Sequence, residues 1–469
     1  MKTTAILFLI SIVLSVNAFA QYGSEAVTDA RSMGMGKTAN ATSQGVYSLG
    51  INPARLVKTE ERIDFVTALP LPHVSVSAGT NFITINDINY YFDGKTYSDN
   101  DKRNLNSLFN NGGLINGDCS FTLLSFAIRL KPSIGAFAFS INDVVDGNFT
   151  VPRAVSSVLL NGNPENSSYS FDDTKLRGWW IRNYSLSYAK KIDEVKTSVF
   201  DKLSAGISIK YYQGFAYAKS ENLNGNSIRT GTDNVISLNT NYSVKTAFSD
   251  NFHVKYAFDT TAKKDAEVSP FSSPAGTGFG IDLGFNVTVC KEYDVALAIT
   301  DIGGITWNKN TALTYSDMQY SLNDIFNKDQ RDSLKNKFKS VSKPVESFST
   351  GLPTTLRFGI ARTFDFNDGG SFPGKLLVAL DINQGFNDEP GNSTKTRVSF
   401  GGEWITARGV PILRTGFSFG GLYGFHWGLG LGIDTGPLEF NFATFDLQSF
   451  LKPNSAKYIS VALDSRWKF

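Results

Sequence analysis

Residue types with specific chemistry are scarce in this chain. Its 469 residues include three histidines, His73, His253 and His426, and none has another histidine at metal-ligand spacing. A single histidine on a strand is more often a polar group of a lumen or interface than a ligand. The acidic clusters at 172–173 and 387–392 lack the spacing of a calcium loop and are typical of solvated turns. The sequence therefore predicts no metal site and no cofactor.

A serine hydrolase would need a serine nucleophile beside a histidine base. Ser418 lies near His426 in the sequence, but no Gly-x-Ser-x-Gly stretch accompanies them. The glycine-rich stretch Gly276–Gly280 is followed by neither a helix nor a basic phosphate-binding residue, so it is typical of a strand and not of a nucleotide loop. We therefore predict that the protein is not an enzyme.

The composition is that of an aromatic-rich chain without long apolar blocks. The net charge of +2 argues against nucleic-acid binding, which needs a strong basic bias. The chain has 42 glycines and 13% aromatic residues but is only 41% hydrophobic, as expected when apolar residues occupy alternate positions. Cys119 and Cys290 are the only cysteines, which excludes a disulfide framework and leaves a single bridge open.

Residues 1–20 have the organisation of a secretory signal. An apolar run, Ala5–Val16, is followed by small residues at Ala18 and Ala20, which predict cleavage before Gln21. The run is too short to span a bilayer, and Gln21 is not the cysteine of a lipoprotein. We therefore expect an exported protein.

Alternation of large apolar residues with polar or small residues recurs along the rest of the chain. Leu203–Tyr211, Phe279–Val289 and Phe425–Ile433 all follow this period of two. Such runs are about as long as the nine to eleven residues that a tilted strand needs to cross a bilayer. A soluble sandwich would also alternate, but export and the aromatic content favour lipid outside and a polar lumen inside. We predict an all-β fold, a transmembrane antiparallel β-barrel of about 14 strands over residues 63–469, with both termini in the periplasm.

The chain is too long for strands and tight turns alone. Ser321–Val341 is predicted to be an amphipathic helix, with Ser321 and Asp324 at its start, and Val151–Asn163 a shorter one. Segments rich in Asn, Asp, Ser and Gly predict long loops. These loops are Asp93–Gly117, Asn161–Arg177, Lys219–Asn234 and Phe258–Gly276.

The stretch Tyr458–Phe469, YISVALDSRWKF, alternates up to an aromatic last residue. One face is apolar except for Ser465. Such a final strand resembles the signal by which the outer-membrane assembly machinery recognises its barrels. The resemblance implies the outer membrane of a Gram-negative bacterium, with membrane lipid and that machinery as partners. The residues of this predicted signal are Val461, Leu463, Trp467 and Phe469.

The segment Ala30–Leu56, ARSMGMGKTANATSQGVYSLGINPARL, resembles the opening of the FadL-type long-chain fatty acid transporter barrels and their relatives, including PorV of the type 9 secretion system. In that family the segment folds into the barrel as a hatch, which here implies a hatch over residues 21–62. Arg55 replaces a usual glycine and Lys37 a second glycine, so fatty-acid specificity does not carry over. The residues that the resemblance places in the hatch and along a ligand path are Arg31, Gly34, Gly36, Asn52, Pro53, Ala54 and Arg55.

The stretch Phe137–Pro152, FAFSINDVVDGNFTVP, is similar to a Bacteroidota outer-membrane family of unknown function. Together the resemblances imply two candidate functions. The barrel either carries a small hydrophobic ligand past a moving hatch, or it is a PorV-like accessory subunit that binds an envelope protein partner through its loops. A continuous apolar pocket in the lumen would favour the carrier. A lumen packed with charged side chains would favour the accessory subunit.

Overall fold

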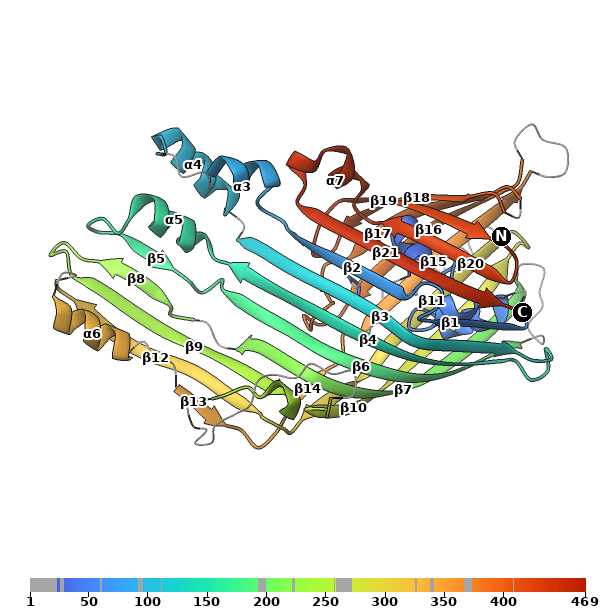
Figure 1. Cartoon of the computed structure of the whole chain (residues 1–469), viewed down its shortest axis with the longest axis horizontal. Coiled ribbons are helices and arrows are strands. Elements are labelled where there is room, and N and C mark those ends of the chain that lie inside the picture. The colour runs from blue at the N-terminus through green and yellow to red at the C-terminus, as the bar shows by residue number, and fades with distance from the viewer. Residues whose placement is uncertain are drawn as a thin grey trace.

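The computed structural model describes residues 23–25, 29–59, 61–91, 96–110, 112–192, 200–221, 224–256, 258, 272–324, 327–337, 341–366, 373–407 and 409–469. The predicted secretory signal lies outside this part of the chain. The described strands form one sheet of 21 segments (Figure 1). The sheet is closed, because β21 pairs antiparallel with β20 on one side and with β1 and β2 on the other.

Several wall strands are interrupted, so the 21 segments form 14 wall strands. β1 and β2 share one wall position, since both pair with β3 and β21. β9 and β10 likewise share a position beside β7, and β11 continues as β12. The predicted antiparallel barrel is confirmed, with the predicted number of strands.

The bounds of the strands and helices are as follows. The strands are β1 Ile63–Thr67, β2 His73–Thr80, β3 Gly113–Arg129, β4 Ala136–Val151, β5 Ser168–Ser170, β6 Lys175–Ile192, β7 Phe200–Glu221, β8 Ser227–Thr230, β9 Ile236–Phe248, β10 Gly276–Val289, β11 Tyr293–Trp307, β12 Ala312–Leu322, β13 Val341–Pro344, β14 Phe348–Gly351, β15 Thr355–Asp365, β16 Lys375–Gly385, β17 Arg397–Ile405, β18 Ile412–Gly420, β19 His426–Asp434, β20 Leu438–Thr444 and β21 Tyr458–Lys468. The α-helices are α2 Ala30–Gly34, α3 Ile85–Tyr91, α4 Asp99–Leu108, α5 Arg153–Asn161, α6 Lys328–Lys337 and α7 Leu447–Leu451, and the 3-10 helices are η1 Gly45–Ser48, η2 Pro53–Lys58, η3 Asp250–Phe252 and η4 Pro453–Ser455.

The barrel is taller on one side than on the other. β3, β4, β6 and β7 have 16 to 22 residues, whereas β16 to β21 have 7 to 11. Turns at the end where the C-terminus lies are short, and the connections at the other end carry α3 to α7 (Figure 1). Barrels of this class have short periplasmic turns and longer extracellular loops, so the C-terminal end faces the periplasm. No described helix is long and apolar enough to cross a membrane.

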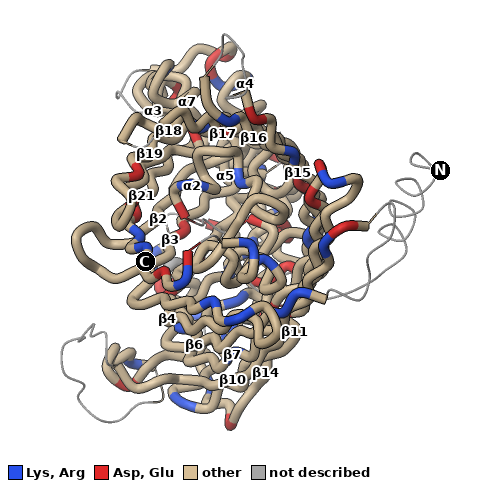
Figure 2. The backbone as a smooth tube through the Cα atoms, turned by 90° about the vertical axis from the view of Figure 1, so that its right-hand side faces the viewer, with Lys and Arg blue, Asp and Glu red and all other residues tan. Residues whose placement is uncertain are grey.

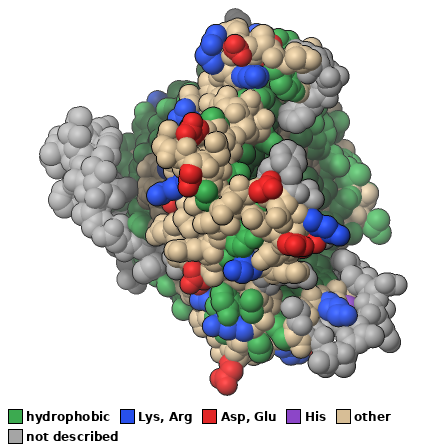
Figure 3. Space-filling view, turned by 90° about the vertical axis from the view of Figure 1, so that its left-hand side faces the viewer, with side chains coloured by type: hydrophobic (Ala, Val, Ile, Leu, Met, Phe, Trp, Pro, Cys, Tyr) green, Lys and Arg blue, Asp and Glu red, His purple; other side chains and the backbone are tan. Residues whose placement is uncertain are grey.

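The outer face of the wall is apolar. On β10 the exposed residues include Phe279, of which 67% is exposed, and Ile281, whereas Asp282 is buried on the inner side. Phe65 stacks on Trp467 and Phe469 at the periplasmic rim, with ring centroids 6.0 Å apart in both pairs. Hydrophobic side chains lie along the flanks of the molecule, and the extracellular end is mainly polar (Figure 3). An apolar belt on a closed barrel places the protein in the outer membrane.

The predicted helices are confirmed in part. Val151–Asn163 contains α5, which follows Pro152 and ends before Gly162, whose φ of 68° favours glycine. The helix predicted over Ser321–Val341 is shorter, because α6 begins at Lys328. Its predicted capping pair is wrong, since Ser321 belongs to β12 and pairs with β9.

Most of the predicted loops contain regular structure. The first contains α4 and the start of β3, the second contains β5, and the third contains β8. Most of Phe258–Gly276 lies outside the described residues. Asn, Asp and Ser are common in these segments because they cap helices and end short strands as well as form turns.

Candidate functional site

Residues 29–59, which we call the luminal segment, lie inside the barrel and are buried along almost their whole length (Figure 1). Asp29 begins α2 by accepting a hydrogen bond from the Ser32 N–H at 2.8 Å. α2 packs against β18 to β21, and η2 packs against β6, β7 and β10. The segment therefore crosses the lumen from wall to wall, where the predicted hatch would lie. Movement of this segment stays a prediction, and residues 21–22 lie outside the described part.

The first half of the luminal segment packs against wall glycines. A Cβ added at Gly416 would lie 2.2 Å from the Met35 carbonyl carbon. A Cβ added at Gly34 would lie 2.8 Å from the Gly430 Cα, and Gly36 has a φ of 68°. Glycine on both sides therefore allows main chain to pack directly on main chain.

The second half docks in the same way on β7 and β10. Asn52 caps η2 by accepting from the Ala54 N–H at 3.0 Å, and Pro53 occupies the first helical turn. A Cβ at Gly206 would lie 2.5 Å from the Ala54 nitrogen. A Cβ at Gly284 would lie 2.1 Å from the Asn52 Oδ1. The Asn-Pro-Ala motif is thus the contact surface of this half.

Arg31 fastens α2 to β17. Its Nε and Nη2 donate to the two carboxylate oxygens of Glu403 at 2.9 and 2.7 Å, and its Nη1 donates to the Thr42 carbonyl at 2.9 Å. Glu403 also accepts from Arg414 Nε at 2.6 Å. Burial alone would lower the pKa of Arg31, but Glu403 raises it above its ordinary value, so this guanidinium stays charged. The bidentate pair fixes both the position and the orientation of the segment.

Arg55 is held by polar groups on three sides. Its Nε donates to the Ser43 carbonyl at 2.9 Å, and its Nη1 donates to Asn286 at 2.7 Å and to Asp294 at 3.0 Å. Lys58 reaches the same Asp294 carboxylate at 2.7 Å. The charge of Arg55 therefore belongs to a paired network. The predicted hatch residues are all buried against the wall or within the segment, and a ligand path along them stays a prediction.

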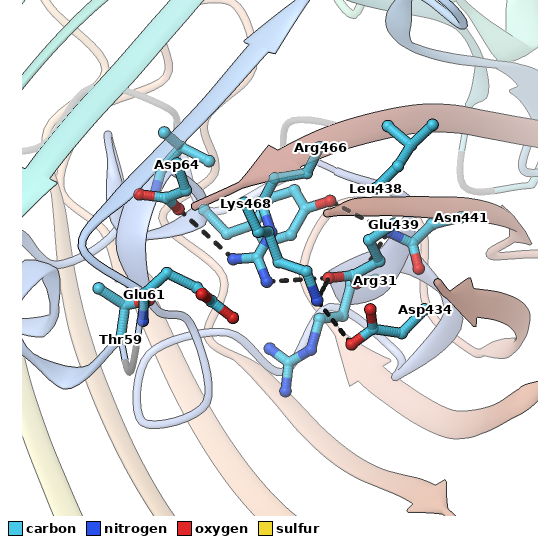
Figure 4. Close-up of polar contacts among 12 residues, drawn as sticks. Arg31, Thr59, Glu61, Asp64, Asp434, Leu438, Glu439, Asn441, Arg466 and Lys468 are labelled. Atoms are coloured by element: carbon cyan, nitrogen blue, oxygen red, sulfur yellow. Dashed lines mark hydrogen bonds and ion pairs between the residues drawn. The ribbon is translucent and has the colours of Figure 1, made fainter. Parts of the chain in front are cut away.

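An ion-pair network that the sequence analysis missed joins the last strands to β1 (Figure 4). Arg466 lies 2.8 Å from Glu439 and 3.5 Å from Asp64. Lys468 lies 2.6 Å from Asp434 and 3.5 Å from Glu439. Both basic residues lie on the polar face of the last strand, which was visible in the sequence. Their partners come from β1, β19 and β20, which only the closed sheet brings together.

A cavity of about 700 Å³ opens at the periplasmic end of the lumen. Its lining includes Arg31, Arg55 and Lys58 of the luminal segment and charged residues of the surrounding strands. Basic and acidic residues gather inside the ring of strands in this view (Figure 2). A lining of this kind disfavours an apolar ligand. The described periplasmic half of the lumen is packed with charged side chains, the outcome that favours an accessory subunit.

The loop between β16 and β17 closes the extracellular half of the lumen. Residues 386–396 fold inward, and Glu389 pairs with Lys219 of β7 at 2.6 Å. The Ser24 N–H donates to Asn392 Oδ1 of this loop at 2.9 Å. This loop and the luminal segment therefore fill the lumen above the periplasmic cavity.

The wall position shared by β1 and β2 is broken by residues 68–72, where Leu69 is 73% exposed. The side chain of Ser465 on β21 satisfies the broken backbone, because its Oγ accepts from the Leu71 N–H at 3.2 Å and donates to the Leu71 carbonyl at 2.8 Å. This contact explains why a serine interrupts the apolar face of the last strand. Next to the break, at His73 where β2 begins, is a cavity of about 40 Å³. It is lined by Asp29, Val46, Tyr47, Leu49, Ile51, His73, Ser120, Thr122 and Asn142.

The DUF5723 family, described as a family of unknown function, matches residues 59–444. The chain belongs to this family. The matched residues cover the wall from β1 to β20 and leave out β21 and nearly all of the luminal segment. No curated protein matches the chain.

Several solved structures are similar to this DUF5723 chain. The toluene transporter TbuX of Ralstonia pickettii is 14% identical, with 95% of this chain and 99% of that chain covered and a TM-score of 0.48. The toluene transporter TodX of Pseudomonas putida is 11% identical, with 96% and 99% covered and a TM-score of 0.44. A FadL homologue of Pseudomonas aeruginosa is 12% identical, with 95% and 99% covered and a TM-score of 0.42. The β-barrel fold of this chain is established by its own strand pairing. The relation of the chain to PorV and to Bacteroidota stays a prediction.

Ser418 and His426, which were considered as a nucleophile and a base, are packed in the lumen. Ser418 and His426 lie opposite each other on β18 and β19, and His426 Nδ1 lies 2.6 Å from Asp446 Oδ1. The Ser418 Oγ accepts from Ser399 at 3.1 Å, and both Ser418 and His426 are buried. Both cysteines are free, so the bridge left open by the sequence does not form.

Proposed function

We propose that this outer-membrane barrel passes small hydrophobic molecules through its wall, between the lipid and the luminal segment. The observation that carries the proposal is the break between β1 and β2 over a cavity lined partly by apolar residues of the luminal segment. A route along the axis would have to cross a buried, charged and filled lumen. An apolar solute dissolved in the membrane already lies against the outer face of the wall. Entry through the wall keeps this solute among apolar groups and out of water.

Passage through the break requires movement. The cavity of about 40 Å³ is far below the roughly 300 Å³ of a small ligand site. The break is held to β21 by hydrogen bonds from Ser465 to Leu71 and from Trp467 Nε1 to the Leu69 carbonyl at 3.1 Å. Opening at the break disrupts few ladder bonds, because residues 68–72 lie between β1 and β2 and outside both strands.

A reversible cross-link tests this route. In a background with both native cysteines changed to serine, Leu71→Cys with Ser465→Cys would tie the break to β21, and mass spectrometry would verify the bond. Oxidation should slow entry of toluene into proteoliposomes and reduction should restore it. The matched control is Leu413→Cys with Leu431→Cys, which are directly opposite on the uninterrupted β18–β19 pair. Equal uptake before and after oxidation of the first pair would refute the route.

The second candidate is an accessory subunit that binds an envelope protein through its extracellular side. The charged, filled lumen favours it, and α6 offers a separable contact at the extracellular end. Replacing residues 327–337 by a Gly-Ser linker should release a partner that co-purifies in mild detergent, while the barrel keeps its heat-dependent migration in gels. A complex that survives the replacement would count against this function.

A further inference from the structure

Aromatic side chains gather on the outer face of the wall at the extracellular ends of β18 and β19. Phe417, Phe419 and Phe425 are 38%, 46% and 49% exposed. The ring centroid of Phe425 lies 6.3 Å from that of Phe417 and 5.3 Å from that of Phe419, and the ring of Trp427 lies 5.7 Å from Phe417. Membrane barrels have girdles of aromatic residues at both interfaces, so this cluster marks the level of the outer membrane interface on this side of the barrel.

The short helix α7 lies at the level of this girdle. Its Gln448 side chain accepts a hydrogen bond from the Trp427 N–H at 3.1 Å. β20 pairs with β19 over Leu429–Asp434, which stops short of Trp427, so α7 continues the wall above β20. Phe450 and Leu451 of α7 are 51% and 61% exposed. Two large apolar side chains are therefore exposed at the membrane interface.

α3 extends this apolar surface. α3 and α7 lie side by side where β2 ends and β21 begins, both in contact with η4 (Figure 1), and the Ile85 N–H donates to the Ala456 carbonyl at 3.3 Å. Ile85 and Ile88 share one side of α3, and each is 44% exposed. On the adjoining wall, Ile459 of β21 and Val76 of β2 are 55% and 45% exposed on the lipid-facing side. The lipid-facing surface of the wall therefore continues into α3 and α7, whose residues Ile85, Ile88, Phe450 and Leu451 we call the collar.

Two exposed lysines flank the collar. Lys452 directly follows α7, and Lys457 directly precedes β21. The Lys457 ammonium donates to the neutral Asn81 carbonyl at 3.0 Å. Within the described part of the chain neither lysine forms an ion pair with a carboxylate, and the acidic residue of α3, Asp87, accepts its hydrogen bonds from Thr84. Two positive charges beside an apolar surface at the interface are suited to the phosphate groups of a lipid.

We propose that the collar binds the phosphorylated glycolipid of the outer leaflet, the lipid A part of lipopolysaccharide. Acyl chains would pack against the apolar side chains of the collar, as they do against the apolar face of an interfacial helix. Lys452 and Lys457 would bind the phosphate groups, with their stems along the apolar surface and their ammonium groups among the headgroups. The collar lies at the extracellular end of the barrel, in the leaflet where this glycolipid takes the place of phospholipid. The inference does not depend on what the barrel carries.

Native mass spectrometry of the delipidated full-length protein in detergent tests the proposal. The probes are bisphosphorylated lipid A, the same lipid with both phosphates removed, and phosphatidylglycerol. We expect the wild-type protein to bind bisphosphorylated lipid A about tenfold more tightly than either other lipid. Lys452→Gln with Lys457→Gln should abolish this preference. Phe450→Ser with Leu451→Ser should weaken binding of both forms of lipid A by about tenfold.

Matched controls come from α6 and β13, on the far side of the extracellular end (Figure 1). Lys328→Gln with Lys343→Gln changes two exposed lysines, and Val341→Ser changes an apolar residue that is 54% exposed. Both should leave lipid binding unchanged. Equal affinity of the wild-type protein for the three lipids, or tighter binding of phosphatidylglycerol, would overturn the proposal, as would a preference that persists in the Lys452→Gln, Lys457→Gln variant. The wild-type comparison needs no variant, so a folding defect cannot mask this outcome.

Discussion

The two halves of the lumen contain similar residues but satisfy them differently. In the periplasmic half, Glu403 lies between Arg31 and Arg414, and each charge has a buried opposite charge. In the extracellular half, Asp118 and Asp146 face each other, and a hydrogen bond between the two acidic side chains takes the place of an opposite charge. Buried polar groups are normally paired, and the first half pairs them by opposite charges whereas the second pairs them by hydrogen bonds between acidic and neutral groups.

The largest effect is expected from Glu403→Leu. The substitution leaves Arg31 and Arg414 buried without their shared carboxylate, which costs about 3–5 kcal/mol. The measurement is the denaturant midpoint of the detergent-solubilised barrel. The control, Glu292→Leu, removes the more exposed pair with Arg362 and should cost about 1 kcal/mol or less. Equal losses of stability in the two variants would show that the buried ion pairs of Glu403 contribute no more than the exposed pair of Glu292.

Stability should also rise with pH in a window set by Lys37. Burial, followed by repulsion from Arg397, lowers the pKa of Lys37 from 10.5 to about 8. Below about pH 8 both folded and unfolded chains hold the proton, so the cost of the buried charge is full. Between about pH 8 and 10.5 the unfolded chain binds more protons, so stability rises, by about 3 kcal/mol in total.

Unfolding midpoints measured from pH 7 to 11 check this prediction. Lys37→Met should be more stable than wild type at pH 7 and should lose the part of the rise that Lys37 causes. Wild type and variant that rise in parallel would show that Lys37 is not the group that titrates.

Two neighbouring glycines of β17 allow the docking of the luminal segment to be tested separately from the effect of alanine on the strand itself. A Cβ at Gly401 would lie 2.1 Å from Thr38 Oγ1, whereas a Cβ at Gly402 has its nearest neighbour at 3.8 Å. Gly401→Ala should therefore weaken docking of the luminal segment by about 1–3 kcal/mol and expose that segment to protease. Gly402→Ala should not. The same cleavage rate in both variants would show that close packing of this face does not hold the segment.

The smallest effect is expected at the break in the wall. Ser465→Ala removes both hydrogen bonds to Leu71 and should weaken the closure by about 1 kcal/mol. Hydrogen exchange of residues 68–72 should then speed up by several-fold, together with toluene uptake. Faster exchange without faster uptake would separate the mobility of the break from transport.

Much of the wall could be predicted from the sequence, because alternation reports directly which side chains face lipid. On β10 the predicted pattern matches the exposed and buried residues from Phe279 to Val287, whereas Val289 at the end of the strand is buried and not exposed as predicted. The break between β1 and β2 also has a signal in the sequence, since Pro70 and Pro72 cannot donate to a strand ladder. Ser321 was assigned to a helix because local periodicity cannot show that β9 offers it a partner strand.

The candidate site was predictable only in part. The motif residues from Arg31 to Arg55 were recognised by resemblance, and they are buried inside the barrel. Their role as a hatch and ligand path stays a prediction. Their partners were not recognised, because Glu403 and Asp294 reach the lumen from strands far along the chain. A single inward acidic residue on a strand carries no sign of which cation it will meet. The way the sheet closes decides which basic residue lies opposite each acidic one. The alternation of apolar and polar residues does not predict how the sheet closes.

The most direct test of the filled lumen is the ionic conductance of the purified protein in a planar lipid bilayer. A lumen closed by the luminal segment and by residues 386–396 predicts no steady conductance for the wild-type protein, and openings for Glu403→Leu. A steady conductance through the wild-type barrel, with its luminal segment shown to be intact by mass spectrometry, would contradict a filled lumen and reopen the axial route.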